Sequence, residues 1–494
     1  MYVIASLCTW GYVSMSSFLI VVFDGLQPSQ VVPELMPNLS RFADEGVFFA
    51  WNHSIFPSVT RLNAATMVTG RLSGGHGLAG NQLVARDYDS NRVLDAMEPD
   101  LARLADATGK VLLAPTLADI LSTHGQEYTA IGVGTSGNAY VHNPTADVAG
   151  GATIHPEFTL PGSLHEHLAS RFGPWPAEDR PNTPRFVHAL RIMKEHILSE
   201  RGPTVALAWS SEPDKSQHSA GVGSELANRA LREADAEFGG LLAWLQETGR
   251  ERDTNMFVLS DHGYSTITGA TDLNSQLRSA GFPPGNEQGG VLVAEQGGSA
   301  LFYVHESDLG TTDRLAQWLM QQPWCGALLA SDSAGGVQGT LPASLAGVDG
   351  PRAPELAMAF RWEDRANDLG YPGHAPSTSG AEGLGQHGGM SRHEMRNTLI
   401  ARGPAFKSGV KLESPSGNVD MAPTILHVLG FSGGEAMDGR ILHEALSAGP
   451  DRIDWTTAGY NAEREFAAGT YRQRIGVSVA GGSAYVDEGN STFE

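Results

Sequence analysis

The sequence predicts an α/β fold in which helices cover both faces of a mostly parallel sheet. Apolar runs of strand length alternate with segments of helical length along much of the chain. The first run, residues 18–23, is apolar without a break, which is typical of a strand buried on both faces of a parallel sheet. Acidic residues directly follow several of these runs, and this position favours ligand binding at the carboxyl edge of the sheet.

The individual elements have local signatures. Residues 36–46 predict a short helix, because Pro37 suits its first turn and Gly46 its end. Apolar runs of strand length predict further strands at residues 128–133, 205–209, 255–260 and 397–401. Segments of helical length predict further helices at residues 185–200, 224–247 and 420–430.

The amino-acid composition of the chain changes after residue 265. Residues 266–384 are rich in Gly, Ser and Pro, with isolated signals for a strand at 300–304 and a helix at 312–321. We interpret this segment as an inserted cap subdomain. The α/β core then comprises residues 15–265 and 385–445.

The last part of the chain, residues 446–494, is expected to form a C-terminal extension. Within it, residues 474–480 and 484–486 have strand character and flank Gly481-Gly482. Two glycines between such runs predict a hairpin.

Composition excludes several classes of function. The chain has 494 residues and a net charge of -22, which disfavours nucleic-acid polymers and anionic membrane surfaces as partners. Two cysteines, Cys8 and Cys325, argue against a disulfide framework and for a reducing compartment. We expect a cytoplasmic protein whose natural start is Met15, with residues 1–14 as upstream sequence. The oligomeric state stays open.

Carboxylates and imidazoles recur where the predicted strands end. Three acidic groups at one sheet edge repel each other unless cations hold them, and this mixture of ligands suits zinc, or manganese less commonly. An Asp-x-x-x-His pair shares one face if its loop makes a helical turn, although taken alone such a pair is more often an ordinary polar turn. The candidate metal ligands are Asp24, Asp214, His218, Asp261, His262 and His387.

Thr60 is the candidate nucleophile. It precedes an expected helix at residues 64–70, and the free N–H groups and dipole of a helix N-terminus favour an alkoxide or a phosphate. By residue type alone, a helix N-cap is the commoner role for a threonine in this position.

These motifs together resemble the type I phosphodiesterase/nucleotide pyrophosphatase family of the alkaline phosphatase superfamily. The resemblance runs from about residue 17 to 430. The motifs occur in the family's order: Asp24-Gly25, Thr60 with Asn63 and Gly70, His76-Gly77 followed by Asn81, Asp214-x-x-x-His218, Asp261-His262-Gly263, and His387-Gly388.

The resemblance implies an alkaline-phosphatase-like three-layer sandwich and two divalent metal ions, zinc before manganese. Thr60 would be the nucleophile and Asn81 would bind a phosphoryl oxygen. One ion would be held by Asp214, His218 and His387, and the other by Asp24, Asp261 and His262.

The implied function is hydrolysis of a small phosphate diester or pyrophosphate, such as a nucleotide-like molecule, through a phospho-threonine intermediate. Alternatives within the superfamily are a phosphonoacetate-type phosphonate hydrolase, a phosphomonoesterase and a cofactor-independent phosphomutase. A sulfatase is disfavoured, because residues 58–62 lack the required Cys or Ser motif. A non-catalytic metal-binding relative is a more remote alternative. The chain departs from the family at Leu62, where proline is common, and it shows no motif for a nucleobase pocket.

Overall fold

The computed structural model describes residues 17–285 and 287–494. Its largest sheet has nine strands in the order β22-β2-β21-β10-β1-β9-β6-β7-β8. Their bounds are β22 (Val410–Leu412), β2 (Val47–Phe49), β21 (Leu399–Arg402), β10 (Thr254–Leu259), β1 (Ser17–Phe23), β9 (Val205–Ser210), β6 (Tyr128–Gly132), β7 (Ala152–Ile154) and β8 (Thr159–Leu160).

The five strands from β10 to β7 run parallel to one another, and β21 and β8 run antiparallel to their neighbours. Strand β1 lies at the centre of this parallel block, and its residues 18–23 are at most 1% exposed. The α/β class with a mostly parallel sheet is therefore confirmed, and the unbroken apolar run at residues 18–23 has the environment that it predicts.

Alternate side chains of β1 pack into two different cores. Ile20 and Val22 join the cluster on one face of the sheet, whereas Leu19 and Val21 join the cluster on the other face. This alternation follows from the period of two in a strand. The central strand thus holds two helical layers together.

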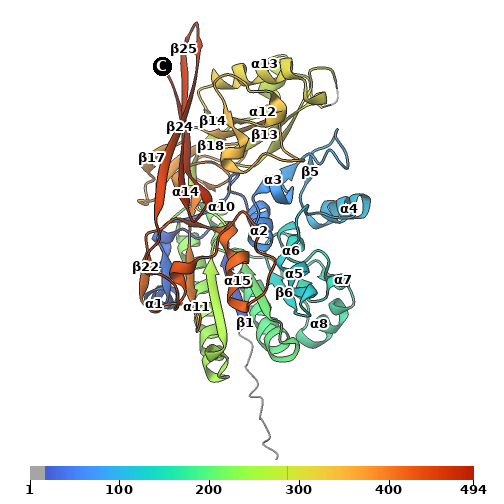
Figure 1. Cartoon of the computed structure of the whole chain (residues 1–494), viewed down its shortest axis with the longest axis vertical. Helices are drawn as coiled ribbons and strands as arrows, with labels where there is room; N and C mark the ends of the chain where they lie inside the picture. Colours follow the sequence, from blue (N-terminus) through green and yellow to red (C-terminus); the bar gives the residue numbers. More distant parts are fainter. Residues whose placement is uncertain (1–16, 286) are drawn as a thin grey trace, which may run out of the picture.

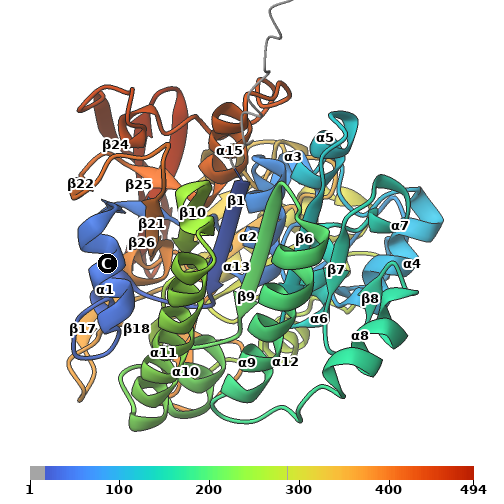
Figure 2. The same ribbon diagram turned by 90° about the horizontal axis from the view of Figure 1, so that it is seen from below.

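Helices cover both faces of the sheet. Figure 2 shows α9 and α11 in front of β9, β1 and β10, with α2 behind them. One layer contains α1 (Pro37–Glu45), α8 (Leu164–Phe172), α9 (Thr183–Ile192), continued by a π-helical segment (Met193–Arg201), and α11 (Glu225–Glu247). The other contains α2 (Thr60–Thr69), α4 (Glu98–Thr108), α5 (Leu117–Thr123), α6 (Ser136–His142) and α15 (Met421–Leu429).

The segment after β10 builds two smaller sheets. The first contains β12 (Val291–Glu295), β13 (Ser299–Val304), β16 (Leu356–Phe360), β14 (Cys325–Ala330) and β15 (Leu341–Pro342), accompanied by α12 (Leu273–Ser279) and α13 (Leu309–Met320). The second contains β17 (Glu363–Ala366), β18 (Pro372–Ser377), β11 (Ser265–Ala270) and β19 (Gly385–Gln386). In Figure 1 the first sheet and its helices lie above the α/β core. The division into a core of residues 15–265 and 385–445, an inserted cap of residues 266–384 and a C-terminal extension of residues 446–494 stays a prediction.

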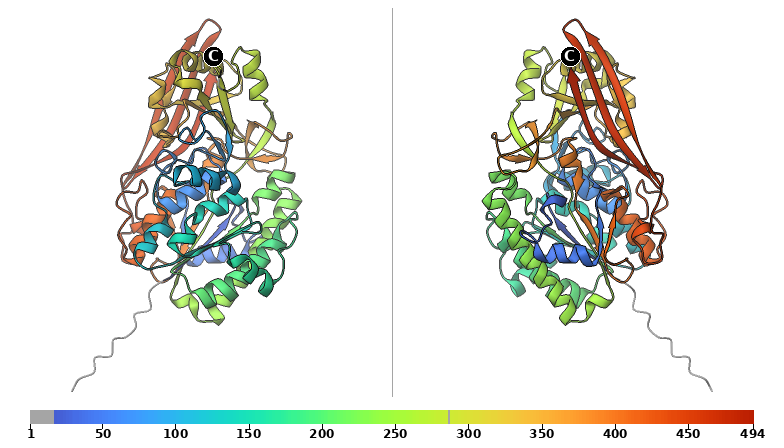
Figure 3. Two further views of the ribbon diagram at one scale, coloured as in Figure 1. Left: turned by 90° about the vertical axis from the view of Figure 1, so that its right-hand side faces the viewer. Right: turned by 90° about the vertical axis from the view of Figure 1, so that its left-hand side faces the viewer.

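The C-terminal residues form a long three-stranded antiparallel sheet, β24 (Trp455–Phe466), β25 (Gly469–Ala480) and β26 (Ser483–Phe493). Gly481 and Gly482, with φ of 57° and 92°, make the two-residue turn between β25 and β26. Figures 1 and 3 show these strands along one side of the molecule, reaching from the α/β core to the five-stranded sheet. The side chain of Gln473 exchanges hydrogen bonds with the backbone of Leu328 in β14. The C-terminal sheet therefore packs against the five-stranded sheet.

Several sequence-based expectations concern the N-terminus and the membrane. Cys8 and the expected start Met15 lie outside the described residues. Cys325 is buried at the start of β14, and burial raises the pKa of its thiol to about 12. Within the part of the chain that the structure covers, no helix combines the length and the apolar character needed to span a membrane.

Candidate metal centre

The acidic candidates meet at one edge of the central sheet. Asp24 follows β1, Asp261 follows β10 by two residues, and Asp214 follows β9 at the start of α10 (Asp214–Ala220). Because β10, β1 and β9 are adjacent and parallel, their carboxyl ends lie side by side. Gly25 turns the chain at this edge with φ of 71°, a conformation that favours glycine.

Asp214 and His218 lie one helical turn apart. Helix α10 begins at Asp214, so the two side chains project from the same face, and Oδ1 of Asp214 is 3.4 Å from Nε2 of His218. The side chain of His218 is 44% exposed, whereas that of Asp214 is 14% exposed. The histidine therefore stands at the solvent side of the centre.

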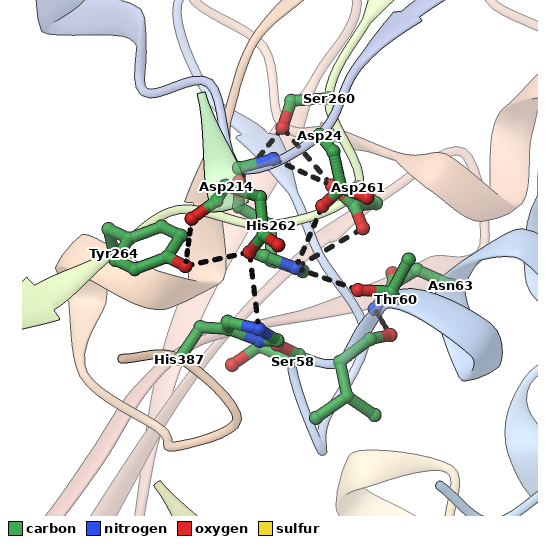
Figure 4. A network of polar contacts seen from close by, with 12 residues as sticks. Asp24, Ser58, Thr60, Asn63, Asp214, Ser260, Asp261, His262, Tyr264 and His387 are labelled. Atoms are coloured by element: carbon green, nitrogen blue, oxygen red, sulfur yellow. Dashed lines mark hydrogen bonds and ion pairs between the residues drawn. The ribbon is translucent and has the colours of Figure 1, made fainter. Parts of the chain in front are cut away.

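His387 reaches the centre from a different sheet. It follows β19, at the edge of the four-stranded sheet, and its Nε2 is 3.5 Å from Oδ1 of Asp214. Its ring stacks on that of His262, with the ring centroids 3.6 Å apart. Figure 4 shows Asp214, His262 and His387 converging on one point. Asp214 thus lies between two of the candidate histidines.

A second cluster adjoins the first. Nε2 of His262 is 3.2 Å from Oδ2 of Asp261 and 3.5 Å from Oδ1 of Asp24. Both oxygens are buried, and neither accepts a hydrogen bond from any residue that the structure describes. Two orphaned carboxylate oxygens facing one imidazole nitrogen are what a cation site requires. Two groups among the described residues have the spacing of metal ligands: Asp214, His262 and His387 form one, and Asp24, Asp261 and His262 form the other. His262 thus belongs to both groups, and His218 to neither.

The backbone sets the tautomer of the three histidines. A carbonyl oxygen only accepts hydrogen bonds, so each Nδ1 carries the proton and each Nε2 turns its lone pair toward the centre, as metal binding needs. The contacts between Nδ1 and carbonyl oxygen are His218 to Gly385 at 3.0 Å, His262 to Gly263 at 3.0 Å and His387 to Ser58 at 2.8 Å.

Aromatic donors orient two of the carboxylates. Nε1 of Trp209 donates to Oδ2 of Asp24 at 2.9 Å, and the hydroxyl of Tyr264 donates to Oδ1 of Asp214 at 2.7 Å. Sequence reasoning missed both roles, because a tryptophan in an apolar strand indicates core packing. The only local signal is that Tyr264 follows the Asp261-His262-Gly263 motif directly.

The electrostatics of the centre call for positive charge. Burial, together with the carboxylates of Asp261 and Asp214, raises the pKa of Asp24 well above its ordinary value. Burial opposes ionisation of Asp214 as well, but His218 and His387 hold its pKa below the ordinary value. Burial and the neighbouring His262 lower the pKa of His387 to about 3. Divalent cations would favour the three ionised carboxylates and the neutral imidazoles together.

Thr60 meets this centre at the N-terminus of α2. It is the first helical residue, four positions earlier than the sequence suggests, and the N-cap position belongs to Val59. The threonine is therefore not the N-cap, and its Oγ1 lies 3.2 Å from Nε2 of His262. Asn63 fixes the preceding turn, since its Nδ2 donates to the carbonyl of Val59 at 3.0 Å. Figure 4 shows Thr60 beside the cluster of Asp24, Asp261 and His262.

Asn81 lies next to Thr60 through Arg61. The backbone N–H of Arg61 donates to Oδ1 of Asn81 at 3.1 Å, and its guanidinium donates to the carbonyl of Asn81 at 2.9 Å. Asn81 lines a pocket of about 250 Å³ together with His218 and His387. This arrangement leaves the Nδ2 of Asn81 available for a ligand beside the centre.

Other residues of the motifs have structural roles. Nε2 of His76 lies 3.0 Å from the hydroxyl of Thr66, and burial lowers the pKa of His76 to about 3. Lys215, within the Asp-x-x-x-His motif, pairs with Glu178 at 2.7 Å. Neither residue is placed among the metal-ligand candidates.

Comparisons with known proteins agree with the geometry. The model of the family "Type I phosphodiesterase / nucleotide pyrophosphatase" matches residues 18–327. Mouse ectonucleotide pyrophosphatase/phosphodiesterase family member 3 is 25% identical over 229 residues, which cover 46% of this chain and 22% of that protein. The match thus spans about a fifth of that relative's length.

Solved structures show the same fold. An inactive variant of murine ectonucleotide pyrophosphatase/phosphodiesterase 5 in complex with AMP superposes with a TM-score of 0.63 at 17% identity. The human protein of that name superposes with a TM-score of 0.62 at 17% identity, and each match covers 87% of this chain and 100% of the other. The chain has an alkaline-phosphatase-like fold and belongs to the type I phosphodiesterase/nucleotide pyrophosphatase family.

Proposed function

We propose that the protein is a two-metal hydrolase of small phosphate diesters or pyrophosphates that acts through a phospho-threonine intermediate. One observation carries this proposal: the hydroxyl of Thr60 lies 3.2 Å from Nε2 of His262, at the point where the two candidate ligand clusters adjoin. A nucleophile beside two carboxylate–imidazole clusters is the arrangement used for phosphoryl transfer.

The residues around Thr60 have separate roles in this scheme. Two divalent cations, zinc before manganese, would lower the pKa of the threonine hydroxyl and offset negative charge on the leaving oxygen. Asp214, His218 and His387 would hold one of them, and Asp24, Asp261 and His262 the other.

Thr60 Oγ attacks phosphorus and its hydroxyl proton passes to water. The P–O bond on the opposite side breaks, the alcohol or phosphate leaves and takes up a proton, and the phosphoryl group stays on the threonine. The Nδ2 group of Asn81 donates to a phosphoryl oxygen, because its Oδ1 is already engaged by the backbone of Arg61. Water then cleaves the bond between phosphorus and Thr60 Oγ, which releases the phosphate monoester and restores the hydroxyl.

A diester or pyrophosphate is favoured over a monoester by the family match. The pocket of about 250 Å³ beside His218 and His387 offers room for a substituent on phosphorus. A comparison of bis-p-nitrophenyl phosphate, p-nitrophenyl phosphate and phosphonoacetate as substrates tests this preference. We expect the diester to have the highest kcat/KM, and faster cleavage of either other compound would point to the corresponding alternative function.

Metal dependence is tested on the purified protein. We expect elemental analysis to find about two zinc or manganese ions per chain, and we expect removal by a chelator to abolish diester hydrolysis until metal is restored. A protein that binds metal and cleaves none of the three compounds would instead be a non-catalytic relative.

The covalent step is tested by Thr60→Ala, with Thr69→Ala as the matched control. Both threonines lie in α2 and are buried, but the hydroxyl of Thr69 donates to the carbonyl of Ala65 and accepts from the backbone N–H of Arg71. We expect Thr60→Ala to lose at least roughly a thousandfold in kcat, as nucleophile removal does in other hydrolases, while the control keeps its activity. Acid quenching during turnover should trap one phosphoryl group on the wild-type peptide that contains Thr60. Full turnover by Thr60→Ala would refute the intermediate.

A further inference from the structure

The pocket beside the metal centre is lined by residues from two parts of the fold. Asn81, His218 and His387 form the side next to the centre, and Glu295 of β12 and Gln386 of β19 contribute from the smaller sheets. A substituent on a phosphoryl group held at the centre can enter this space, because Asn81, His218 and His387 border it. The chemistry of its walls therefore selects that substituent.

The walls are unusually rich in hydrogen-bond acceptors. Glu295 is half-buried, and its carboxylate accepts one long hydrogen bond, from Asn274 at 3.3 Å. Burial and the nearby carboxylate of Asp272 raise the pKa of Glu295, which reflects the lack of a compensating cation. Asp95 lines the same pocket, 59% exposed, at 3.5 Å from Arg61.

The side chain of Gln386 provides an independent indication that the pocket accommodates a hydrogen-bond donor of a ligand. It is 2% exposed and lines the pocket, and its Oε1 accepts no hydrogen bond within residues 17–285 and 287–494. A buried acceptor without a donor is costly, so a ligand that supplies an N–H group would be stabilised here.

Two other classes of substituent are disfavoured. Among the described residues that line the pocket there is no lysine or arginine, so further phosphate groups find no counter-charge. The same lining has no phenylalanine, tyrosine or tryptophan, so a nucleobase finds no stacking surface from these residues.

We propose that this pocket binds a primary ammonium group, so that the preferred substrates are phosphodiesters of a small amino alcohol. The inference rests on the proposed function, because it assumes that the phosphoryl group lies at the metal centre. The ammonium would pair with Glu295, with Asp95 adding negative potential, and donate to Oε1 of Gln386.

Calorimetry on the metal-loaded protein tests the proposal without relying on turnover. The probes are phosphoethanolamine, propyl phosphate, which has a similar size and no amine, and phosphocholine, which has the charge and no N–H group. We expect phosphoethanolamine to bind roughly tenfold more tightly than propyl phosphate, in the range of one partly exposed charge pair. Phosphocholine should bind with intermediate affinity.

A pair of conservative variants assigns the effect. Glu295→Gln should reduce the preference for phosphoethanolamine over propyl phosphate to within about twofold, because it keeps the shape and removes the charge. Glu413→Gln changes a surface residue that pairs with Lys411 and should leave the preference intact. Glu413→Gln should also keep the wild-type rate of bis-p-nitrophenyl phosphate cleavage.

The outcomes separate the two proposals. Equal or tighter binding of propyl phosphate or phosphocholine, or a preference that survives Glu295→Gln, would overturn the ammonium pocket even if diester hydrolysis is found. Absence of hydrolysis in a protein that shows the predicted binding order would refute the enzymatic function while the pocket stands.

Discussion

Tyr264 gives the sharpest test of how the centre is built, because its hydroxyl reaches a candidate ligand directly. It donates to Oδ1 of Asp214 at 2.7 Å, the same oxygen that lies 3.4 Å from Nε2 of His218. The ring is fully buried and wedged between two glycines. A Cβ added at Gly25 or at Gly385 would lie 2.7 Å or 2.8 Å from ring carbons of Tyr264. Tyr264→Phe therefore keeps the packing and removes the hydroxyl's contacts with Oδ1 and, at 3.0 Å, with the backbone carbonyl of Asp214.

The magnitude follows from the charge on the acceptor. A hydrogen bond to a charged group contributes about 1.5–3 kcal/mol, and loss of such an outer partner of a metal ligand typically lowers metal affinity by roughly 10–100-fold. We expect Tyr264→Phe to bind zinc within this range of weakening. Competition with a chromophoric chelator measures the affinity directly, separately from catalysis.

A matched variant shows whether the effect is specific. Tyr471 is also fully buried, and its hydroxyl donates to the carbonyl of Gly326 in the cap at 2.6 Å. Tyr471→Phe should lower stability and leave zinc affinity unchanged. If Tyr264→Phe bound zinc within twofold of the wild type, or if both variants lost affinity equally, the proposed orientation of Asp214 by Tyr264 would be wrong.

Three further predictions concern other parts of the centre. Glu394 is buried near His387, where its carboxylate accepts the N–H of Gly389, and burial raises its pKa to about 7. Its contribution to folding is therefore present at low pH and is lost, by about 3 kcal/mol, as the pH rises from about 4.5 to 7. Denaturation of Glu394→Gln at several pH values should lack this loss, and the same pH dependence as the wild type would contradict the reasoning. Gly388 has φ of 104°, and a Cβ added there would overlap the carbonyl of Gln296. Gly388→Ala should therefore lower both the thermal midpoint and the metal content. A variant that is as stable as the wild type and fully loaded with metal would contradict this prediction. Trp209→Phe removes the donor to Asp24 and should reduce the bound metal measured after dialysis, and unchanged stoichiometry and affinity would argue against this role.

Local sequence patterns suffice for the elements that present the ligands. The apolar run of β1 predicts its buried position, and the positions of Asp24 and Asp261 after strands place them at one sheet edge once the strands are parallel. The four-residue spacing of Asp214 and His218 encodes their shared helical face. These features depend only on residues that are close in the sequence, and over that range the strand period of 2 and the helix period of about 3.6 residues fix which side chains share a face.

The start of α2 shows where local patterns are insufficient. The sequence suggests a helix from residue 64, whereas α2 begins at Thr60. Helix ends depend on the side chains around them, and here Asn63 holds the preceding turn by hydrogen bonds to Ile55 and Val59. The earlier start brings Thr60 to His262, which residue type alone could not distinguish from an N-cap.

By itself, then, the sequence determined the class of fold, the family motifs and the set of candidate ligands. Only the tertiary structure decided which groups orient those ligands and what surrounds the substrate. Tyr264 and Asp214 are 50 residues apart, and Trp209 and Asp24 are 185 apart. Glu295 reaches the pocket from a separate sheet. Such contacts arise from the packing of whole layers, which no short-range periodicity records.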